Sequence, residues 1–295
     1  MLLRHSIPFS EEVKFIDINI YGKGSEHMSG KDVFESNRAA WNQAAAYHQK
    51  AFDHALHVGF QDPEFSVFKR KRDYIVNEKL SQIDFSGKTI AHIPCNNGRE
   101  LLSLMRLGAE EGVGFDISDA AILEAQELAV IAKANARFVR TNALEIDATY
   151  NGYFDFIYIS QGSLQWFPNL NDYFHVISRL LKQNGQIIIF EIHPFKYFFE
   201  NGFSFQKQNY DKLTSYFETG PNHYPKGLDY FGNVEYESSE GFWFMHKVSD
   251  IITAILHNGI EIESFDEYPL DLDGNPDNDV EGKFPFSYLI TGKKK

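Results

Sequence analysis

Cysteine is almost absent from this chain of 295 residues, which contains Cys95 alone. A single cysteine excludes an internal disulfide framework and the cysteine pairs of structural zinc sites. The chain also lacks an apolar run of about 18 residues, the length that a membrane-spanning helix needs. Near the N-terminus, Glu11 and Glu12 interrupt the apolar start before a secretory signal could form. We therefore expect a cytoplasmic protein without a membrane partner.

Positive charge is also scarce, with 28 lysines and arginines against 41 acidic residues and a formal net charge of −13. Such a chain repels phosphate backbones unless its basic residues are concentrated in one patch. The run "KRKR" at 69–72 and the final three lysines are the available candidates. On a helix, four consecutive residues point in four directions, so a solvated surface is the alternative to an anionic partner. We predict no nucleic-acid partner, and the sequence does not indicate an oligomeric state.

Several catalytic motifs are missing. The chain has no "HExxH" zinc motif, no "GxSxG" nucleophile motif and no "GxxxxGK[ST]" phosphate loop. We therefore predict no metal. Aromatic residues, in contrast, are plentiful at 15% and are concentrated after residue 195. This concentration indicates a pocket or lid.

The N-terminal third contains turn formers followed by two helical patterns. Residues 1–35 have no sustained periodicity and are predicted to form an extension. A helix is predicted from Ser36, its N-cap, to a stop at Gly59, with apolar residues at spacings of three or four on one face. A second helix is predicted over 64–80. Together, residues 36–85 would form a helical cap on the domain that spans 36–295.

From Thr89 onward, short apolar runs alternate with amphipathic helices. Strands are predicted at 89–93, 112–116, 136–140, 154–159 and 186–192, with helices at 98–107, 119–133 and 170–182. Strand runs such as "FDFIYIS" and "QIIIFEI" are almost continuously apolar, as in parallel sheets that are covered on both faces. This alternation predicts an α/β fold with a doubly wound, mostly parallel, Rossmann-like sheet of seven strands.

The regular alternation stops after Pro194. Residues 195–245 are predicted to form an aromatic, lid-like insertion with a hairpin around Gly232-Asn233. A helix then ends near Gly259, and two consecutive strands follow it. Because no helix separates these two strands, we expect them to pair antiparallel at the end of the sheet.

The loop "PCNNG" at 94–98 follows the first strand of this alternating region. Ligands bind at the carboxyl ends of strands in such sheets, where helix N-termini attract anions. Asn96, Asn97 and Gly98 all tolerate positive φ, so the loop is expected to form a backbone cradle. Asp116 ends the second strand, where a carboxylate can accept hydrogen bonds from both hydroxyls of a ribose. The alternative for Asp116 is a favourable interaction with the dipole of the following helix.

The run "GKTIAHIPCNNGRELLSLMRLGAEEGVGFDISDAAILEAQELA" resembles class I S-adenosylmethionine-dependent methyltransferases, and specifically a bacterial branch with a glycine-poor "HxxCxxG" first motif. Pro94 and Asn96 take the first two glycine positions of the usual G-x-G-x-G loop, and Gly98 takes the third. The likeness extends through "SNRAAWNQAAAYH", "FDFIYISQGSLQWFPNL" and "FEIHPF". It covers residues 36–195 well and the remainder loosely.

The resemblance implies S-adenosyl-L-methionine as cofactor and a set of residues around it. The backbone of Cys95, Asn96, Asn97 and Gly98 would hold the methionine part, and Asp116 the ribose. Ile117 would pack on the adenine, whose edge Asn142 and the Ala143 backbone would contact. Ser160 and Gln161 would face the sulfonium, and the helix with Trp41 would close over the cofactor.

Some of these residues have structural alternatives. Asn142 could cap a turn, Trp41 could be a core residue, and Cys95 could be a small packing residue without a nucleophilic role. His92 on its buried strand is interpreted as a hydrogen-bonded core residue rather than a base.

Glu191 and His193 are the predicted catalytic residues. They are alternate residues at the end of the fifth strand, so they face one side and could orient or deprotonate a methyl acceptor. A structural role for His193 is the alternative, and His246 is a weaker candidate. The leading hypothesis is a transferase that moves a methyl group to a small-molecule acceptor. The alternatives are a non-catalytic cofactor-binding protein of the same fold and a nicotinamide-dependent oxidoreductase.

Overall fold

The computed structural model describes residues 30–52, 55–199, 206–218, 220–224, 228, 236, 238–272 and 282–295. The predicted hairpin around Gly232-Asn233 and most of the predicted extension 1–35 lie outside these residues. Within the described ranges, no helix has the length and apolarity to cross a membrane.

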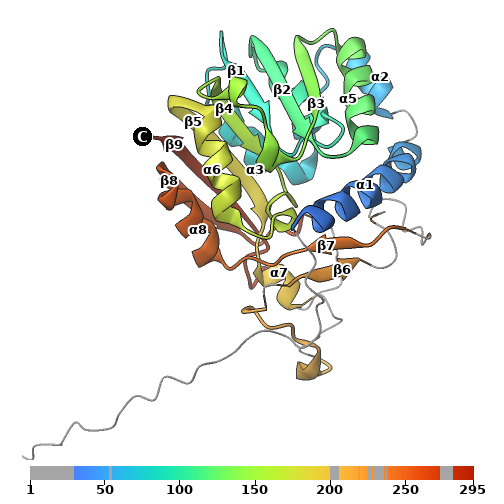
Figure 1. The fold of residues 1–295 in the computed structure, drawn as a ribbon, viewed down its shortest axis with the longest axis vertical. Coiled ribbons are helices and arrows are strands. Elements are labelled where there is room, and N and C mark those ends of the chain that lie inside the picture. Colours follow the sequence, from blue (N-terminus) through green and yellow to red (C-terminus); the bar gives the residue numbers. More distant parts are fainter. Residues whose placement is uncertain are drawn as a thin grey trace, which may run out of the picture.

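A seven-stranded sheet forms the centre of the molecule, in the order β3-β2-β1-β4-β5-β9-β8 (Figure 1). Its parallel strands are β1 (Thr89–His92), β2 (Glu111–Asp116), β3 (Ala136–Arg140), β4 (Phe154–Ile159) and β5 (Leu181–Ile192). The last strand, β9 (Ser287–Lys294), is antiparallel to both β5 and β8 (Ile260–Tyr268). The predicted fold class and the terminal antiparallel pair are confirmed. The strand order reverses between β1 and β4, which is where such sheets bind ligands.

Helices cover both faces of this sheet. On one face lie α2 (Ala55–Gln61), α3 (Tyr74–Leu80), α4 (Arg99–Met105) and α5 (Asp119–Ala132), and on the other lie α6 (Leu170–Leu180) and α8 (Val248–His257). Successive strand residues therefore enter different cores. Phe156 packs in the first and Ile157 in the second. This double coverage explains why the strands are apolar at nearly every position.

The helices before the sheet differ from the prediction. Helix α1 (Gly30–Phe52) begins before Ser36, whose hydroxyl donates to the Glu240 carbonyl instead of capping a helix. The predicted stop, Gly59, lies inside α2. The predicted helix over 64–80 is divided into the 3-10 turns η1 (Val67–Lys69) and η2 (Lys71–Asp73), followed by α3.

Polar side chains explain this division. The Ser66 hydroxyl accepts from the Phe68 N–H, and the Val67 N–H donates to the hydroxyl of Ser103. These bonds replace those of a regular helix. The basic run at 69–72 is also used internally, because Arg70 pairs with the buried carboxylate of Asp73 at 2.7 Å. It is neither a fully solvated face nor an open anion patch.

Helix α1 runs along the carboxyl-terminal edge of the sheet, next to the small antiparallel pair β6 (Asn222–Tyr224) and β7 (Gly241–Trp243) (Figure 1). The Asn37 amide pairs with the Phe242 backbone in both directions, at 2.9 and 2.7 Å. At the other side of the helix, Asn42 hydrogen-bonds Ser118 and Asp119 at the start of α5. Helix α1 therefore connects the insertion to the sheet.

Candidate functional site

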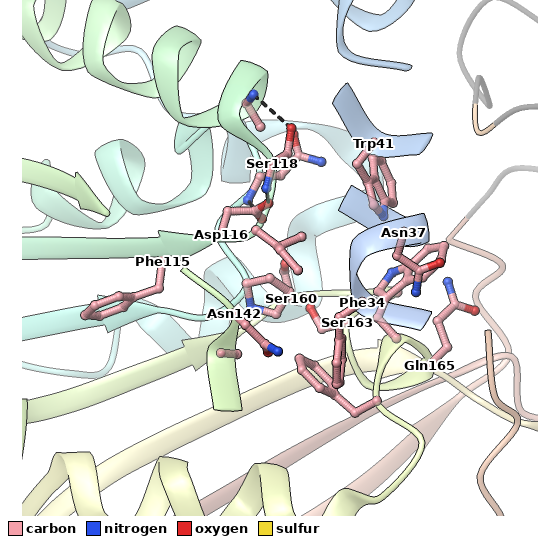
Figure 2. A pocket seen from close by; sticks show the side chains of 18 of the residues that line it. Phe34, Asn37, Trp41, Phe115, Asp116, Ser118, Asn142, Ser160, Ser163 and Gln165 are labelled. Atoms are coloured by element: carbon pink, nitrogen blue, oxygen red, sulfur yellow. Dashed lines mark hydrogen bonds between the residues drawn. The ribbon is translucent and has the colours of Figure 1, made fainter. Parts of the chain in front are cut away.

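A cavity of about 360 Å³ lies at the carboxyl ends of the central strands, with α1 along one side (Figure 2). Its lining comes from α1 and from the segments that follow β1, β2, β3, β4 and β5. Eight of the predicted cofactor residues meet there: Trp41, Asn96, Asp116, Ile117, Asn142, Ala143, Ser160 and Gln161. Cys95, Asn97, Gly98, Glu191 and His193 do not line it.

Asp116 stands at the wall of the cavity, at the tip of β2 (Figure 2). One of its carboxylate oxygens accepts from the Asn96 N–H at 2.8 Å and the other from the Ser118 N–H at 2.9 Å. Burial raises the pKa of Asp116 above its ordinary value, while the backbone N–H groups of Ser118, Asn96 and Ile117 act against that rise. A carboxylate has about four lone-pair sites, so it can still accept a hydrogen bond from a ligand.

The loop 94–98 does not form the expected cradle of free N–H groups. The Cys95 N–H donates to the carbonyl of Phe115, and the Asn96 N–H donates to Asp116. The next two N–H groups, of Asn97 and Gly98, bond to acceptors within the loop itself. Only Pro94 and Asn96 reach the cavity. The Asn96 side chain bonds within the loop, whereas the Asn97 amide donates to Glu124 on α5. Asn96 adopts positive φ as expected.

Gly98 has a packing role that the sequence did not show. Its φ is +74°, and a Cβ added to it would lie 2.4 Å from the ring of Phe138 on β3. The glycine therefore allows the start of α4 to approach β3 closely. Cys95 and Asn97 are buried beside it. Burial raises the pKa of the Cys95 thiol well above its ordinary value, which agrees with a packing role rather than a nucleophilic one.

Asn142 caps a turn, which is the alternative role considered for it. It is the N-cap of the turn η3 (Ala143–Glu145), and its Oδ1 accepts from the Leu144 N–H at 3.1 Å. The same side chain lines the cavity (Figure 2). Capping fixes its orientation and leaves a second lone pair on Oδ1 for a ligand.

The opposite wall is aromatic and was largely missed in the sequence. Trp41 packs edge-on against Trp166, with ring centroids 5.2 Å apart, and Phe34 approaches Phe167. Other lining residues that were not predicted include Asn37, Ser163, Gln165, Ile192, Tyr197 and Leu228. The run "SQGSLQWFPN" after β4 contains five of the missed residues, namely Gly162, Ser163, Gln165, Trp166 and Phe167, and its position at a strand end was the available signal.

Glu191 lies behind this wall. Its side chain is buried, and its carboxylate accepts from the backbone N–H groups of Gly162, Ser163 and Leu164. Burial raises the pKa of Glu191 to about 7, although these hydrogen bonds lower it. The carboxylate is directed at the backbone of a loop and is not brought to the cavity, so the geometry does not support the predicted contact with an acceptor.

His193 is likewise turned away from the cavity. Its Nε2 lies 2.9 Å from the Glu267 carboxylate on β8, and its Nδ1 accepts from the Phe195 N–H. This second bond anchors the start of the short helix α7 (Phe195–Phe198). The structural alternative considered for His193 is the one that these contacts support. His246 also bonds to backbone, with its Nε2 2.9 Å from the Phe167 carbonyl.

His92 contacts the lining of the cavity through the side chain of Ser160. It is fully buried, and its Nε2 lies 2.9 Å from the hydroxyl of Ser160, which lines the cavity. Burial lowers the pKa of His92 to about 4, so the ring is neutral at pH 7. This geometry agrees with the interpretation of His92 as a hydrogen-bonded core residue.

Comparison with known proteins agrees with the fold. Residues 90–185 match the family described as "Methyltransferase domain". No curated protein matches the chain in sequence.

Three solved structures share its fold. A protein from Listeria monocytogenes that is described as an S-adenosylmethionine dependent methyltransferase is 19% identical. Its TM-score is 0.58 over 76% of this chain and 97% of the other. One from Mesorhizobium loti is 15% identical, with a TM-score of 0.56 over 76% and 98%. Geranyl diphosphate C-methyltransferase from Streptomyces coelicolor A3(2), solved with S-adenosyl-L-homocysteine, is 14% identical, with a TM-score of 0.55 over 89% and 98%.

These findings confirm two predictions at the level of the domain. Residues 90–185 match a methyltransferase domain, so the predicted enzyme class is supported, and S-adenosyl-L-methionine is the cofactor of that class. At these identities the structural likeness shows the fold alone. The individual site residues, the methyl acceptor, the location in the cell and the absence of nucleic-acid and membrane partners stay predictions.

Proposed function

We propose that this protein transfers the methyl group of S-adenosyl-L-methionine to a small-molecule acceptor inside the cavity between α1 and the sheet. The reaction is an in-line displacement, in which the acceptor atom forms a bond to the methyl carbon as the carbon–sulfur bond breaks. Catalysis of such a step depends mainly on alignment and exclusion of water, without a covalent enzyme intermediate. The observation on which the proposal rests is the position of Asp116 in the cavity wall, at the tip of β2.

Asp116 and its neighbours suit the nucleoside part of the cofactor. The carboxylate is held by two backbone N–H groups and can accept from ribose hydroxyls. Ile117 follows directly, and Asn142 and Ala143 line the adjacent part of the cavity. An apolar side chain against the face of adenine and an amide at its edge would complete the recognition.

The other half of the cavity suits an uncharged acceptor with apolar surface. Trp41, Trp166 and Tyr197 supply rings there. Among the described residues of the lining, Asp116 is the one acidic side chain, and no lysine, arginine or histidine joins it. A diphosphate, the group named for the substrate of the Streptomyces coelicolor relative, would find no cationic partner among these side chains. We therefore propose a neutral acceptor.

The acceptor's reactive atom must also offer an electron pair, from a lone pair or a π bond, without help from a strong base. Glu191 and His193 are directed elsewhere, and His92 has a pKa of about 4. A base of such low pKa removes protons inefficiently at neutral pH. The expected acceptor atom is one that is already unprotonated near pH 7.

Calorimetric titration tests the cofactor assignment. S-adenosyl-L-homocysteine should bind the purified full chain, and a nicotinamide dinucleotide should not. At about 100 times its dissociation constant, a ligand stabilises a protein by roughly 2.7 kcal/mol, which thermal unfolding detects independently. Binding of the dinucleotide alone would contradict the proposal and favour an oxidoreductase.

Turnover tests the reaction itself. With S-adenosyl-L-methionine and a panel of neutral aromatic and heteroaromatic acceptors, formation of S-adenosyl-L-homocysteine should exceed the rate without acceptor. Matched anionic analogues, in which a carboxylate replaces a carboxamide, should react less well. Equal or preferred reaction of the anionic partners would show that the charge of the acceptor has been misjudged.

A further inference from the structure

The loop over residues 160–167 supplies a large continuous part of the cavity wall, with both aromatic and polar residues. Seven of its eight residues line the cavity, namely Ser160, Gln161, Gly162, Ser163, Gln165, Trp166 and Phe167. The segment contains a single 3-10 turn, η5 (Leu164–Trp166), and is otherwise irregular. Its shape therefore depends on contacts from outside the segment.

The turn η5 has no side-chain cap of its own. Ser163 occupies the N-cap position, but its side chain makes no capping hydrogen bond. The free N–H groups at the start of a helical turn need acceptors, and an anion is the most favourable one there. Glu191 supplies it from β5, a strand distant in sequence.

The geometry of this contact is specific. Glu191 Oε2 accepts from the Ser163 N–H at 2.8 Å and from the Leu164 N–H at 2.9 Å, and Oε1 accepts from the Gly162 N–H. Oε1 also accepts from the Ile192 N–H at 2.7 Å. With a side chain that is 4% exposed, the carboxylate makes these bonds away from water. Charge-assisted bonds of this kind are stronger than neutral ones.

We propose that Glu191 is a positioning residue, whose ionised carboxylate holds the loop 160–167 in the shape that binds cofactor and acceptor. This inference rests on the proposed function only for the identity of the ligands. The contact between carboxylate and loop stands on the geometry alone. It replaces the acid–base role predicted from the position of Glu191 at the strand end.

Protonation of Glu191 must then weaken the hydrogen bonds that hold the loop. A carboxylic acid carries an O–H where the carboxylate offered a lone pair, so it cannot accept from all of these N–H groups. Burial raises the pKa of Glu191 to about 7, which places the change near neutral pH. The ionisable groups that face it are the phenols of Tyr158, Tyr173 and Tyr288. Their pKa values are raised, so they remain neutral between pH 6 and 8.

Hydrogen exchange of the ligand-free protein tests the contact directly. In the wild type at pH 8, the amides of Gly162, Ser163 and Leu164 should be protected relative to their intrinsic exchange rates. In Glu191→Gln, an isosteric change that removes the anion, we expect exchange at least tenfold faster in this segment. Lowering the pH of the wild type to 6 should reduce its protection factors toward those of the variant. Glu263→Gln, which removes a carboxylate from β8 that pairs with Lys293, is the matched control and should leave the segment unchanged.

Titration with S-adenosyl-L-homocysteine tests the consequence for the site. At pH 8 the affinity of Glu191→Gln should be at least tenfold below that of the wild type, and at pH 6 the two should differ by less than threefold. A purely structural defect would lower the affinity equally at both pH values. Equal exchange in the wild type and Glu191→Gln would overturn the inference. If the wild type binds no S-adenosyl-L-homocysteine while exchange responds as expected, the positioning contact stands and the proposed function fails.

Discussion

The Asp116 carboxylate has two tasks at the residue scale, because it both organises the loop after β1 and faces the cavity. Replacement by alanine should weaken binding of S-adenosyl-L-homocysteine by about 1.5–3 kcal/mol, the range for hydrogen bonds to a charged group. Calorimetry measures this change. Asp116→Asn has nearly the same shape and keeps one carbonyl oxygen as acceptor, so it distinguishes the effect of charge from the effect of side-chain shape. Unchanged affinity in both variants would remove Asp116 from the site.

We expect substitution of Gly98 to cost more stability than substitution of Cys95, because of packing rather than contact with a ligand. A methyl group at position 98 would overlap the Phe138 ring, and the positive φ adds strain. We predict that Gly98→Ala destabilises the fold by about 2–4 kcal/mol and Cys95→Ala by about 1–2 kcal/mol, measured by urea unfolding. Gly98→Val should also impair cofactor binding more than Cys95→Ala does.

A second substitution tests the explanation for Gly98. If overlap with Phe138 is the cause, Phe138→Leu should recover part of the stability that Gly98→Ala loses, as a favourable coupling in a double-mutant cycle. Simple additivity of the two losses would show that the backbone conformation, and not the ring, sets the cost.

At the scale of elements, helix α1 is fastened to the sheet by a small polar cluster. The Oδ1 of Asn42 accepts from the Ser118 hydroxyl and the Ala120 N–H, and its Nδ2 donates to Asp119. Arg38 reaches the same Asp119 carboxylate at 2.7 Å. Because α1 also supplies Trp41 to the cavity, this cluster determines how the helix covers the site.

Asn42→Ala should therefore loosen α1. We expect a loss of stability of about 1–2 kcal/mol, faster proteolysis within α1 and weaker binding of S-adenosyl-L-homocysteine. Lys50→Ala, at an exposed position of the same helix, is the control and should behave like the wild type. Equal proteolysis of the two variants would mean that the contacts of α1 with β7 hold it without Asn42.

The elements of the sheet were predictable, whereas those before it were not. The pattern over 89–192 predicted the parallel strands within a residue or two, except that β5 begins earlier, at Leu181. The central strands β4 and β5 contain apolar runs whose burial on both faces leaves a clear pattern. The segment 64–80 shows the opposite case. Its apolar spacing resembled one helix, but side-chain hydrogen bonds from Ser66 and Ser103 divided it, and such long-range partners leave no periodic signal.

At the scale of the whole molecule, His92 should make stability depend on pH. Burial lowers its pKa from 6.5 to about 4 in the folded state, so only the unfolded chain takes up this proton just below pH 6.5. Folding stability is therefore lost as the pH falls from 6.5 toward 4. Between pH 7.5 and 5, the wild type should lose about 2 kcal/mol more than His92→Asn.

Urea unfolding across this range provides the measurement. Glu191 acts with the opposite sign, because its raised pKa means that the folded state binds the extra proton, but this contribution is common to both proteins. Parallel stability curves for the wild type and His92→Asn would contradict the burial of a neutral imidazole at position 92.

The sequence by itself determined the α/β class, the positions of the parallel strands along the chain, and the set of residues at the carboxyl ends of these strands. These follow from local periodicity and chain order, which a linear sequence contains. Eight of the predicted cofactor residues consequently meet at one cavity. Resemblance in the same segments indicated the methyltransferase domain and its cofactor.

Only the tertiary structure decided the roles of the remaining residues. Glu191 and Gly98 lie at strand ends or in the loop where site residues are expected. However, the Glu191 carboxylate bonds to the backbone of a loop, and Gly98 packs against the Phe138 ring. The direction of a side chain at a strand end depends on which distant donors and rings pack against it. Those partners are brought together by folding, and no spacing in the sequence encodes them.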